Sequence, residues 1–262
     1  MAKVASATIK TSLESLGIPT EHIHFLSRQG IEEAEAYYAR LPHVPVPPHI
    51  QHGKKLRQHI IDCRGQVRWK VVTLVREQVA RDVSNLFQNI GDSFPHLDTL
   101  THTQALSQVT DYLLKLFANF DESTDFACTW FDKEIKQMFD VDLYATDFDL
   151  DRGYQIYRSE MADILLLKLE KLSSCHQQAF REFLGIEQFR LVKANMARQK
   201  PHHQLYQEVL TTLTLPESTL DKIYASRHAR HFYSATDLAG FKERWSGQRQ
   251  FTTGPASLPL KD

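Results

Sequence analysis

The chain has 262 residues, of which 42% are hydrophobic and 24% charged, and its formal net charge is −1 at pH 7. This balance is that of an ordinary globular protein, and the length is enough to bury a substantial core. It excludes a strongly basic surface, so we predict neither a nucleic-acid partner nor electrostatic attraction to a membrane.

The sequence contains no run of 18 apolar residues and no signal-peptide-like apolar stretch near its start. We therefore expect no membrane span and a cytoplasmic protein. Its three cysteines, Cys63, Cys128 and Cys175, are widely spaced and form no CxxC pair. We expect them to be buried free thiols in a reducing compartment.

The first stretch that can carry chemistry is small, polar and basic, and it leads into a helical pattern at Ile9, Leu13 and Leu16. A helix N-terminus carries partial positive charge, and small residues let backbone N–H groups approach an anion. We predict a phosphate-binding loop there, although the stretch lacks the glycines of GxxxxGK[ST] and can also be read as a plain helix start. Its residues are Lys3, Val4, Ala5, Ser6, Ala7 and Thr8.

A phosphate loop ordinarily follows a β-strand, but only two residues precede Lys3. Either the first strand of the fold is missing from this sequence, or the loop does not bind phosphate. We keep both readings open.

Glu21 to Leu26 has the pattern of a short strand with His22 and His24 on one face. A neutral imidazole can act as a general base near neutral pH, so either histidine is a candidate base. A metal site is less favoured, since no ligand spacing completes it nearby. A purely structural role for these histidines is the alternative.

The next stretch predicts two helices joined by a proline-rich connection. The helices span residues 31–41 and 53–63, and we expect His43–Ile50 to be an extended surface segment because prolines cannot continue a helix. The loops His43–Gly53 and Asp92–Thr103 are the candidates for an acceptor-binding surface.

The strongest pattern is the apolar, β-branched run Val71–Val75, which is followed at once by helical spacing from Val79 to Ile90. It predicts a strand in the middle of a parallel sheet that leads directly into a helix. Arg76 then lies at the carboxyl end of a strand, where open α/β sheets bind ligands. With the hydroxyl of Ser84 two helical turns on, it suits a phosphate monoester. Arg76 can equally cap a sheet edge, with Ser84 on the helix surface.

The rest of the chain predicts a sheet flanked by helices. Glu170 follows an apolar strand, where it can orient a basic residue or be solvated. We predict strands over residues 154–158 and 163–170, helices over 104–117, 124–139, 173–184, 220–229 and 235–245, and a frayed tail from about 247.

These pieces together resemble the sulfotransferases, and most closely the bacterial family of capsular polysaccharide synthesis proteins. The Arg76/Ser84 pair behind an apolar strand is the more specific element. The matching stretches are 1–9, 22–26, 70–88, 130–134, 164–172 and 231–234.

The resemblance implies one α/β domain over residues 1–262, with a P-loop-like parallel sheet flanked by helices. It implies transfer of a sulfuryl group from 3′-phosphoadenosine 5′-phosphosulfate to a hydroxyl, here of a glycan, without a metal. A P-loop-type kinase and a catalytically degenerate nucleotide-binding protein are the alternatives.

Carried over to this sequence, the resemblance assigns the loop from Lys3 to Thr8 to the donor's 5′-phosphosulfate. It assigns Arg76 and Ser84 to the donor's 3′-phosphate. It makes His24 the base, with His22 as the alternative, and Lys3 the cation beside the leaving phosphate.

Overall fold

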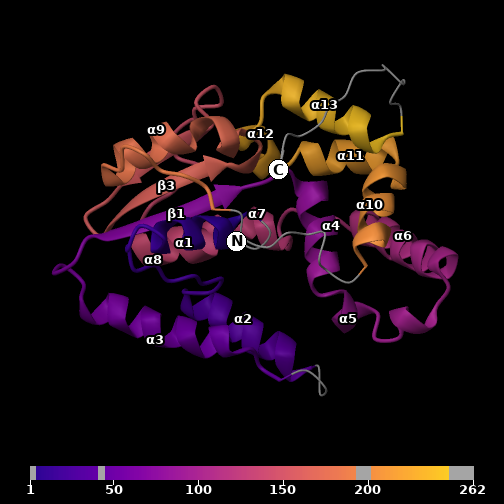
Figure 1. Cartoon of the computed structure of the whole chain (residues 1–262), viewed down its shortest axis with the longest axis horizontal. Coiled ribbons are helices and arrows are strands. Elements are labelled where there is room, and N and C mark those ends of the chain that lie inside the picture. The colour runs from indigo at the N-terminus through magenta and orange to yellow at the C-terminus, as the bar shows by residue number, and fades with distance from the viewer. Residues whose placement is uncertain (1–3, 41–44, 193–201, 248–262) are drawn as a thin grey trace.

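The computed structural model describes residues 4–40, 45–192 and 202–247, and these form a helix-rich mixed α/β fold around one small sheet (Figure 1). Three strands make up the described sheet: β1 (Trp69–Val75), β2 (Tyr154–Arg158) and β3 (Ala162–Lys168). Their order is β1-β3-β2; β1 runs parallel to β3, and β2 runs antiparallel to it. The prediction of an α/β fold is confirmed, but the prediction of a wholly parallel sheet is wrong, because β2 is antiparallel to β3.

The central strand is β3, whereas the sequence predicts the strand at Val71–Val75 for that place. All seven residues of β3 are buried, but β1 is buried only over its last three residues. Burying apolar side chains is favourable whether helices or neighbouring strands cover them, because the hydrophobic effect has no direction. The run alone therefore could not distinguish an edge strand from a central one.

The junction from β1 into the next helix has the predicted form. Two residues, Arg76 and Glu77, separate β1 from α4 (Gln78–Gln88), and the side chain of Glu77 caps the helix by accepting from Val79 N and Ala80 N. In the parallel pair, Val75 lies opposite Lys168, so β1 and β3 end side by side. This shared carboxyl end holds Arg76.

The N-terminal half contributes six further described helices. α3 begins at Pro48, which suits the first helical position, so the expected extended segment ends earlier than predicted. These helices are α1 (Ser6–Glu14), α2 (Arg28–Ala39), α3 (Pro48–Asp62), α5 (Ile90–Ser93), the 3₁₀ turn η1 (Leu97–Thr99) and α6 (His102–Ala118).

The helix predicted over residues 124–139 is present, but a π-helical stretch interrupts it. Its parts are α7 (Phe126–Trp130), the π-helix η2 (Phe131–Lys136) and α8 (Gln137–Phe139). The remaining elements are the 3₁₀ turn η3 (Leu169–Lys171), α9 (Leu172–Leu184), α10 (His203–Thr212), α11 (Glu217–Tyr224), α12 (Arg227–Phe232) and α13 (Ala235–Trp245).

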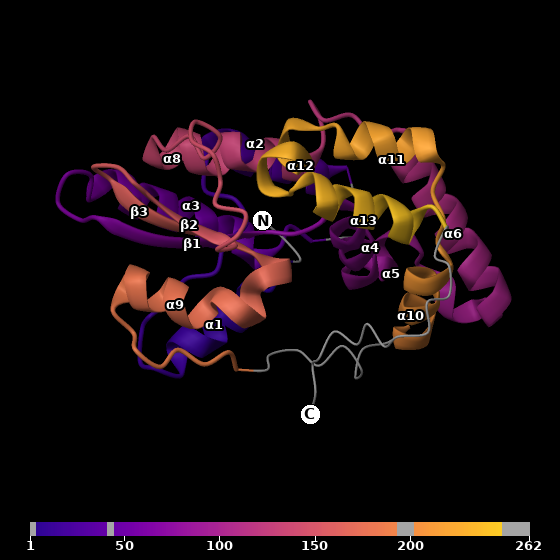
Figure 2. The same ribbon diagram turned by 90° about the horizontal axis from the view of Figure 1, so that it is seen from above.

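Two large hydrophobic clusters fill most of the described interior, and a small third one joins α2 and α3 through Ile31, Ala34 and Ile50. The first packs the sheet against α1, α9 and the α7–α8 region; the second lies among α4, α6, α10, α11 and α13. Figure 2 shows the sheet between α1 and α9 on one side and α2 and α8 on the other, with the second group of helices beside it. β1 belongs to the first cluster and α4 to the second, so their junction joins the two.

The prediction of a strand over Glu21–Leu26 is wrong: these residues form neither strand nor helix. Among the described strands none pairs with this segment, and the side chain of Glu134 in η2 accepts from the backbone N–H of Leu26 instead. The frayed tail predicted from about residue 247 falls almost wholly on 248–262, outside the described residues. Cys128 and Cys175 are buried free thiols as expected, whereas Cys63 is partly exposed.

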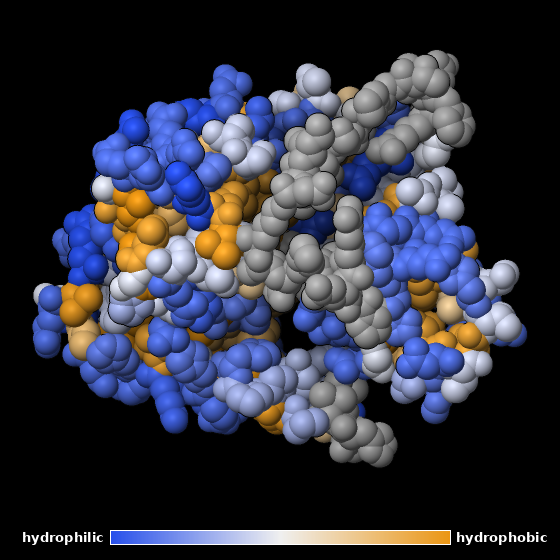
Figure 3. Space-filling view, viewed as in Figure 1, coloured by the Kyte–Doolittle hydropathy of each residue, from blue (hydrophilic) through white to orange (hydrophobic). Residues whose placement is uncertain are grey.

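Hydrophilic side chains predominate on the face shown in Figure 3, where the apolar areas are small and separate. Among the described helices, none is long and apolar enough to cross a bilayer.

Candidate functional site

The first candidate place is the N-terminus of α1, inside the predicted phosphate loop. Ala5 precedes the helix in a left-handed conformation, at φ 63°, and its side chain cannot cap the helix. The first N–H groups of α1 thus have no side-chain cap and carry the partial positive charge of a helix N-terminus. Val4 is buried in the sheet cluster, while Lys3 lies outside the described residues.

Ser6 and His22, both predicted site residues, meet at this helix end. Ser6 Oγ lies 2.8 Å from His22 Nε2, so one donates a hydrogen bond to the other. Burial lowers the pKa of His22, and the nearby Lys10 and His49 lower it further. His22 is therefore a neutral imidazole at neutral pH, the form in which it can accept a proton.

His24 lies beside His22, with ring centroids 4.8 Å apart in an edge-to-face arrangement. A third imidazole, His49 in the first turn of α3, lies 5.6 Å from His24 between ring centroids. Burial lowers the pKa of His49 as well. The sequence placed His49 only in a candidate acceptor loop, since nothing in its local pattern connects it with residues 22–24.

These three imidazoles do not make a metal site of recognisable form. Within residues 4–40, 45–192 and 202–247, no group of three or more histidine, cysteine, aspartate or glutamate side chains is arranged to hold a metal ion. What the arrangement can do is accept a proton beside the α1 terminus.

The second candidate place is the carboxyl end of β1. Arg76 follows the strand directly and is partly exposed, and Ser84 is partly buried on α4. Ser84 stands about 9 Å further along the helix axis than Gln78, at 1.5 Å per residue. The predicted strand-end position of Arg76 is confirmed. That Arg76 and Ser84 face the same ligand as the α1 terminus stays a prediction.

Glu170 orients the backbone beside Arg76. It follows β3 within η3; its Oε1 accepts from the backbone N–H of Glu77 at 2.8 Å, and its Oε2 accepts from Tyr233 Oη at 3.2 Å. Of the two readings of Glu170, the structure supports an orienting role, although the group it orients is a backbone amide.

Local sequence patterns do not indicate the polar cluster that lies behind the start of α4. Gln78 Nε2 donates to Asp82 Oδ2 at 2.9 Å and to Asp125 Oδ2 at 3.0 Å. The guanidinium of Arg81 pairs with Asp82 and lies 3.7 Å from Asp125 Oδ2. His228, also buried, completes the cluster from α12. Each of these residues reads alone as a polar helix-surface residue, because Asp125 and His228 are remote in sequence from Gln78, Arg81 and Asp82 on α4.

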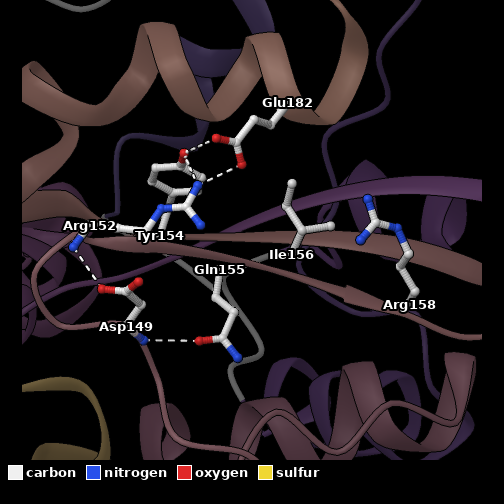
Figure 4. A pocket seen from close by; sticks show the side chains of 7 residues that line it. All are labelled: Asp149, Arg152, Tyr154, Gln155, Ile156, Arg158 and Glu182. Carbon is white, nitrogen blue, oxygen red and sulfur yellow. Dashed lines mark hydrogen bonds and ion pairs between the residues drawn. The ribbon is translucent and has the colours of Figure 1, made fainter.

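A separate hollow of about 440 Å³ lies along the outer edge of β2 (Figure 4). Arg152 Nη2 binds Glu182 Oε2 at 2.6 Å, and Tyr154 Oη donates to Glu182 Oε1 at 2.9 Å. The charges and hydrogen-bonding groups of these three side chains are thus paired with one another. None of the three was predicted as a site residue. The hollow is lined by Asp149, Arg152, Tyr154, Gln155, Ile156, Arg158 and Glu182.

Residues 107–234 match the model of a protein family described as "putative capsular polysaccharide synthesis protein". The match loosely suggests a role in polysaccharide biosynthesis. It includes the stretches 130–134, 164–172 and 231–234 but neither of the two candidate places. No curated protein and no solved structure matches the chain.

Proposed function

We propose that this chain is a transferase of polysaccharide biosynthesis that moves a sulfuryl group from 3′-phosphoadenosine 5′-phosphosulfate to a glycan hydroxyl. The polysaccharide part rests on the family match over residues 107–234. The sulfuryl part rests on the arrangement at the α1 terminus and on the resemblance that the sequence shows.

The observation that carries the proposal is the contact between Ser6 Oγ and His22 Nε2 at 2.8 Å. It brings a histidine candidate to the N-terminus of α1, whose first N–H groups have no side-chain cap. A helix N-terminus attracts an anion, and a neutral imidazole accepts a proton. These are the two properties that transfer from an anionic donor to a hydroxyl needs at one place.

The residues fit the donor as follows. The α1 terminus, with Ser6 and Thr8, would hold the 5′-phosphosulfate together with Lys3. Arg76 and Ser84 would hold the 3′-phosphate, since a guanidinium pairs well with a phosphate dianion. The donor, when bound, supplies the activated sulfuryl group.

The protein's own part in the step is proton transfer and charge stabilisation. The acceptor hydroxyl oxygen forms a bond to sulfur while the bond from sulfur to the phosphate oxygen breaks. His24 or His22 takes the hydroxyl proton, and the α1 terminus stabilises the negative charge that grows on the leaving phosphate. The products are the sulfate ester and adenosine 3′,5′-bisphosphate.

Isothermal titration calorimetry with adenosine 3′,5′-bisphosphate in EDTA tests the proposal. We expect binding without metal, and we expect Arg76→Ala to weaken it about 10- to 100-fold, corresponding to a charge-assisted hydrogen bond of roughly 1.5–3 kcal/mol. Arg28→Ala is the matched control, since Arg28 is an exposed arginine paired with Glu32. Transfer from radiolabelled donor to dextran then tests the reaction itself.

Three outcomes separate the alternatives. Binding of ATP with Mg²⁺, but not of the bisphosphate, would instead favour a P-loop-type kinase. Metal-free bisphosphate binding without transfer to any of several polysaccharides would favour a degenerate nucleotide-binding protein. Absence of binding to either nucleotide at millimolar concentration would overturn the proposal.

A further inference from the structure

The segment His22–Ser27 carries two candidate bases yet has no regular secondary structure. Its backbone groups therefore need partners from elsewhere. Two side chains of the α7–η2 helix, more than a hundred residues later, supply them: Trp130 and Glu134.

Trp130 binds the backbone of His24 itself. Its Nε1–H donates to His24 O at 2.9 Å. The indole is largely buried, at 7% exposed, so its ring packs in the sheet cluster while its N–H faces the segment. This bond fixes the peptide that carries the imidazole of His24.

Glu134 binds the end of the segment. Its Oε2 accepts from Leu26 N at 2.6 Å and from Ser27 N at 2.7 Å, and its Oε1 accepts from Ser27 Oγ at 3.1 Å. Glu134 is 3% exposed, and burial raises its pKa, whereas the bonds from Ser27 and Leu26 lower it. A buried carboxylate with three donors holds its partners rigidly, because losing any of them leaves charge unsatisfied.

Two glycines leave room for this close approach. A Cβ at Gly30 would lie 1.8 Å from Glu134 Oε1, and one at Gly53 would lie 2.4 Å from the carbonyl oxygen of Phe25. Both glycines are in helices, where glycine is otherwise unfavourable. The absence of a side chain at these two positions thus lets α2 and α3 lie in close contact with the segment and with Glu134.

The π-helix adds an independent observation. η2 begins directly after Trp130 and contains Glu134. π-helical turns are rare and occur frequently at functional sites. Here Glu134 lies within the π-helical stretch, and Trp130 directly precedes it.

We propose that Trp130 and Glu134 are positioning residues, which fix His22 and His24 at the N-terminus of α1 without touching the donor or the acceptor. The inference rests on the proposed function for its catalytic consequence. Its structural part, the fixed orientation of the two imidazoles, can be measured without any activity.

Trp130→Phe tests the inference because it keeps an aromatic ring and removes the Nε1 donor. We expect the pKa of His22, followed by NMR titration of the imidazole Cε1–H signals, to rise toward its ordinary value as the loosened segment admits water. We expect kcat for sulfuryl transfer to fall about tenfold, with the pH profile shifted and the affinity for adenosine 3′,5′-bisphosphate unchanged. Glu134→Gln, which puts an amide donor against Leu26 N or Ser27 N, should act in the same direction.

Trp69→Phe is the matched control. Trp69 Nε1 is buried without a hydrogen-bond partner among the described residues, so its removal costs no bond. We expect wild-type imidazole titrations and turnover from it. His22→Gln and His24→Gln assign the two signals.

The result that overturns the inference is a Trp130→Phe protein whose His22 and His24 titrate as in the wild type. Equal effects of Trp130→Phe and Trp69→Phe would overturn it too, because they would show a general packing effect. If the wild type transfers no sulfuryl group, the proposed function fails, while the imidazole titrations still decide whether Trp130 and Glu134 position the histidines.

Discussion

The proposed function rests on single residues at the start of α1. Ala5 adopts a left-handed conformation that glycine tolerates better than alanine. The next residue, Ser6, contacts His22. The backbone turn and the imidazole thus meet at one helix terminus, and each can be tested by a small substitution.

The base is tested by comparing His24→Ala with His22→Ala. We expect His24→Ala to lower kcat for sulfuryl transfer roughly a hundred- to ten-thousandfold, with little change in donor affinity, because a general base acts on the acceptor proton. Steady-state kinetics and calorimetry measure the two quantities. If His22→Ala proves the damaging change, the base is His22.

The turn is tested by Ala5→Gly against Ala7→Gly. Ala5→Gly should leave stability unchanged or raise it by up to about 1 kcal/mol, because glycine relieves the left-handed strain. Ala7→Gly, inside α1, should lower it by up to about 1 kcal/mol. Urea denaturation measures both, and equal losses would contradict the left-handed turn.

At the scale of elements, α4, α7 and α12 are joined by a buried polar cluster with two oppositely shifted groups. Burial, opposed by Arg81 and assisted by Asp125, raises the pKa of Asp82 to about 7. Burial and then Arg81 lower the pKa of His228 to about 3, against Asp125. Gln78 and Glu77 also face Asp82, and His231 and Arg227 face His228.

In the wild type, the pH dependence of stability that Asp82 contributes should cancel the one that His228 contributes. The raised pKa of Asp82 gives stability that is present below its usual 3.8 and is lost as the pH rises toward 7. The lowered pKa of His228 gives stability that is present above its usual 6.5 and is lost as the pH falls toward 3. Between about pH 4 and 6.5 the slopes are opposite, each at most about 1.4 kcal/mol per pH unit.

Replacing either group alone should leave the other group's effect on the pH dependence of the free energy of unfolding uncompensated. Between pH 4 and 6.5, we expect the free energy of unfolding of Asp82→Asn to rise with pH relative to wild type, and that of His228→Gln to fall. Urea denaturation at several pH values measures this, with Asp111→Asn on the exposed side of α6 as the control. Parallel pH dependence in all four proteins would refute the coupling.

At the scale of the whole molecule, Glu77 joins the end of β1 to the helices of the second hydrophobic cluster. It is 3% exposed. Beside capping α4, its Oε1 accepts from Tyr224 Oη at 2.8 Å and its Oε2 from Trp245 Nε1 at 3.3 Å. Its own N–H donates to Glu170. The end of β1 and the helices α11 and α13 therefore depend on one carboxylate.

Glu77→Ala should lower the free energy of unfolding by about 3–5 kcal/mol, because it removes a helix cap and leaves two buried donors unsatisfied. Glu217→Ala, at an exposed glutamate of α11, should change it by no more than about 0.5 kcal/mol. Urea denaturation followed by both circular dichroism and tryptophan fluorescence measures the loss. A loss below 1 kcal/mol for Glu77→Ala would show that α4, α11 and α13 are held at the end of β1 by other contacts.

The sequence alone determined those helices and strands that have a clear hydrophobic periodicity along their own length. The β1–α4 junction, the strands β2 and β3, and the helices α6 and α9 appear close to where the periodicity predicts them. Arg76 lies at a strand end because the apolar run stops there. These features follow from neighbouring residues, whose side-chain directions the backbone fixes.

Only the tertiary structure decided which strand is central, where the histidines lie and which polar residues are buried. Trp69 pairs with Ala162, and Leu26 and Ser27 bind Glu134, across about a hundred residues or more. No local pattern contains such partners. Gln78, Arg81 and Glu134 look like polar helix-surface residues in sequence. Their burial depends on partners from remote segments: Asp125 for Gln78 and Arg81, and the backbone of residues 26–27 for Glu134.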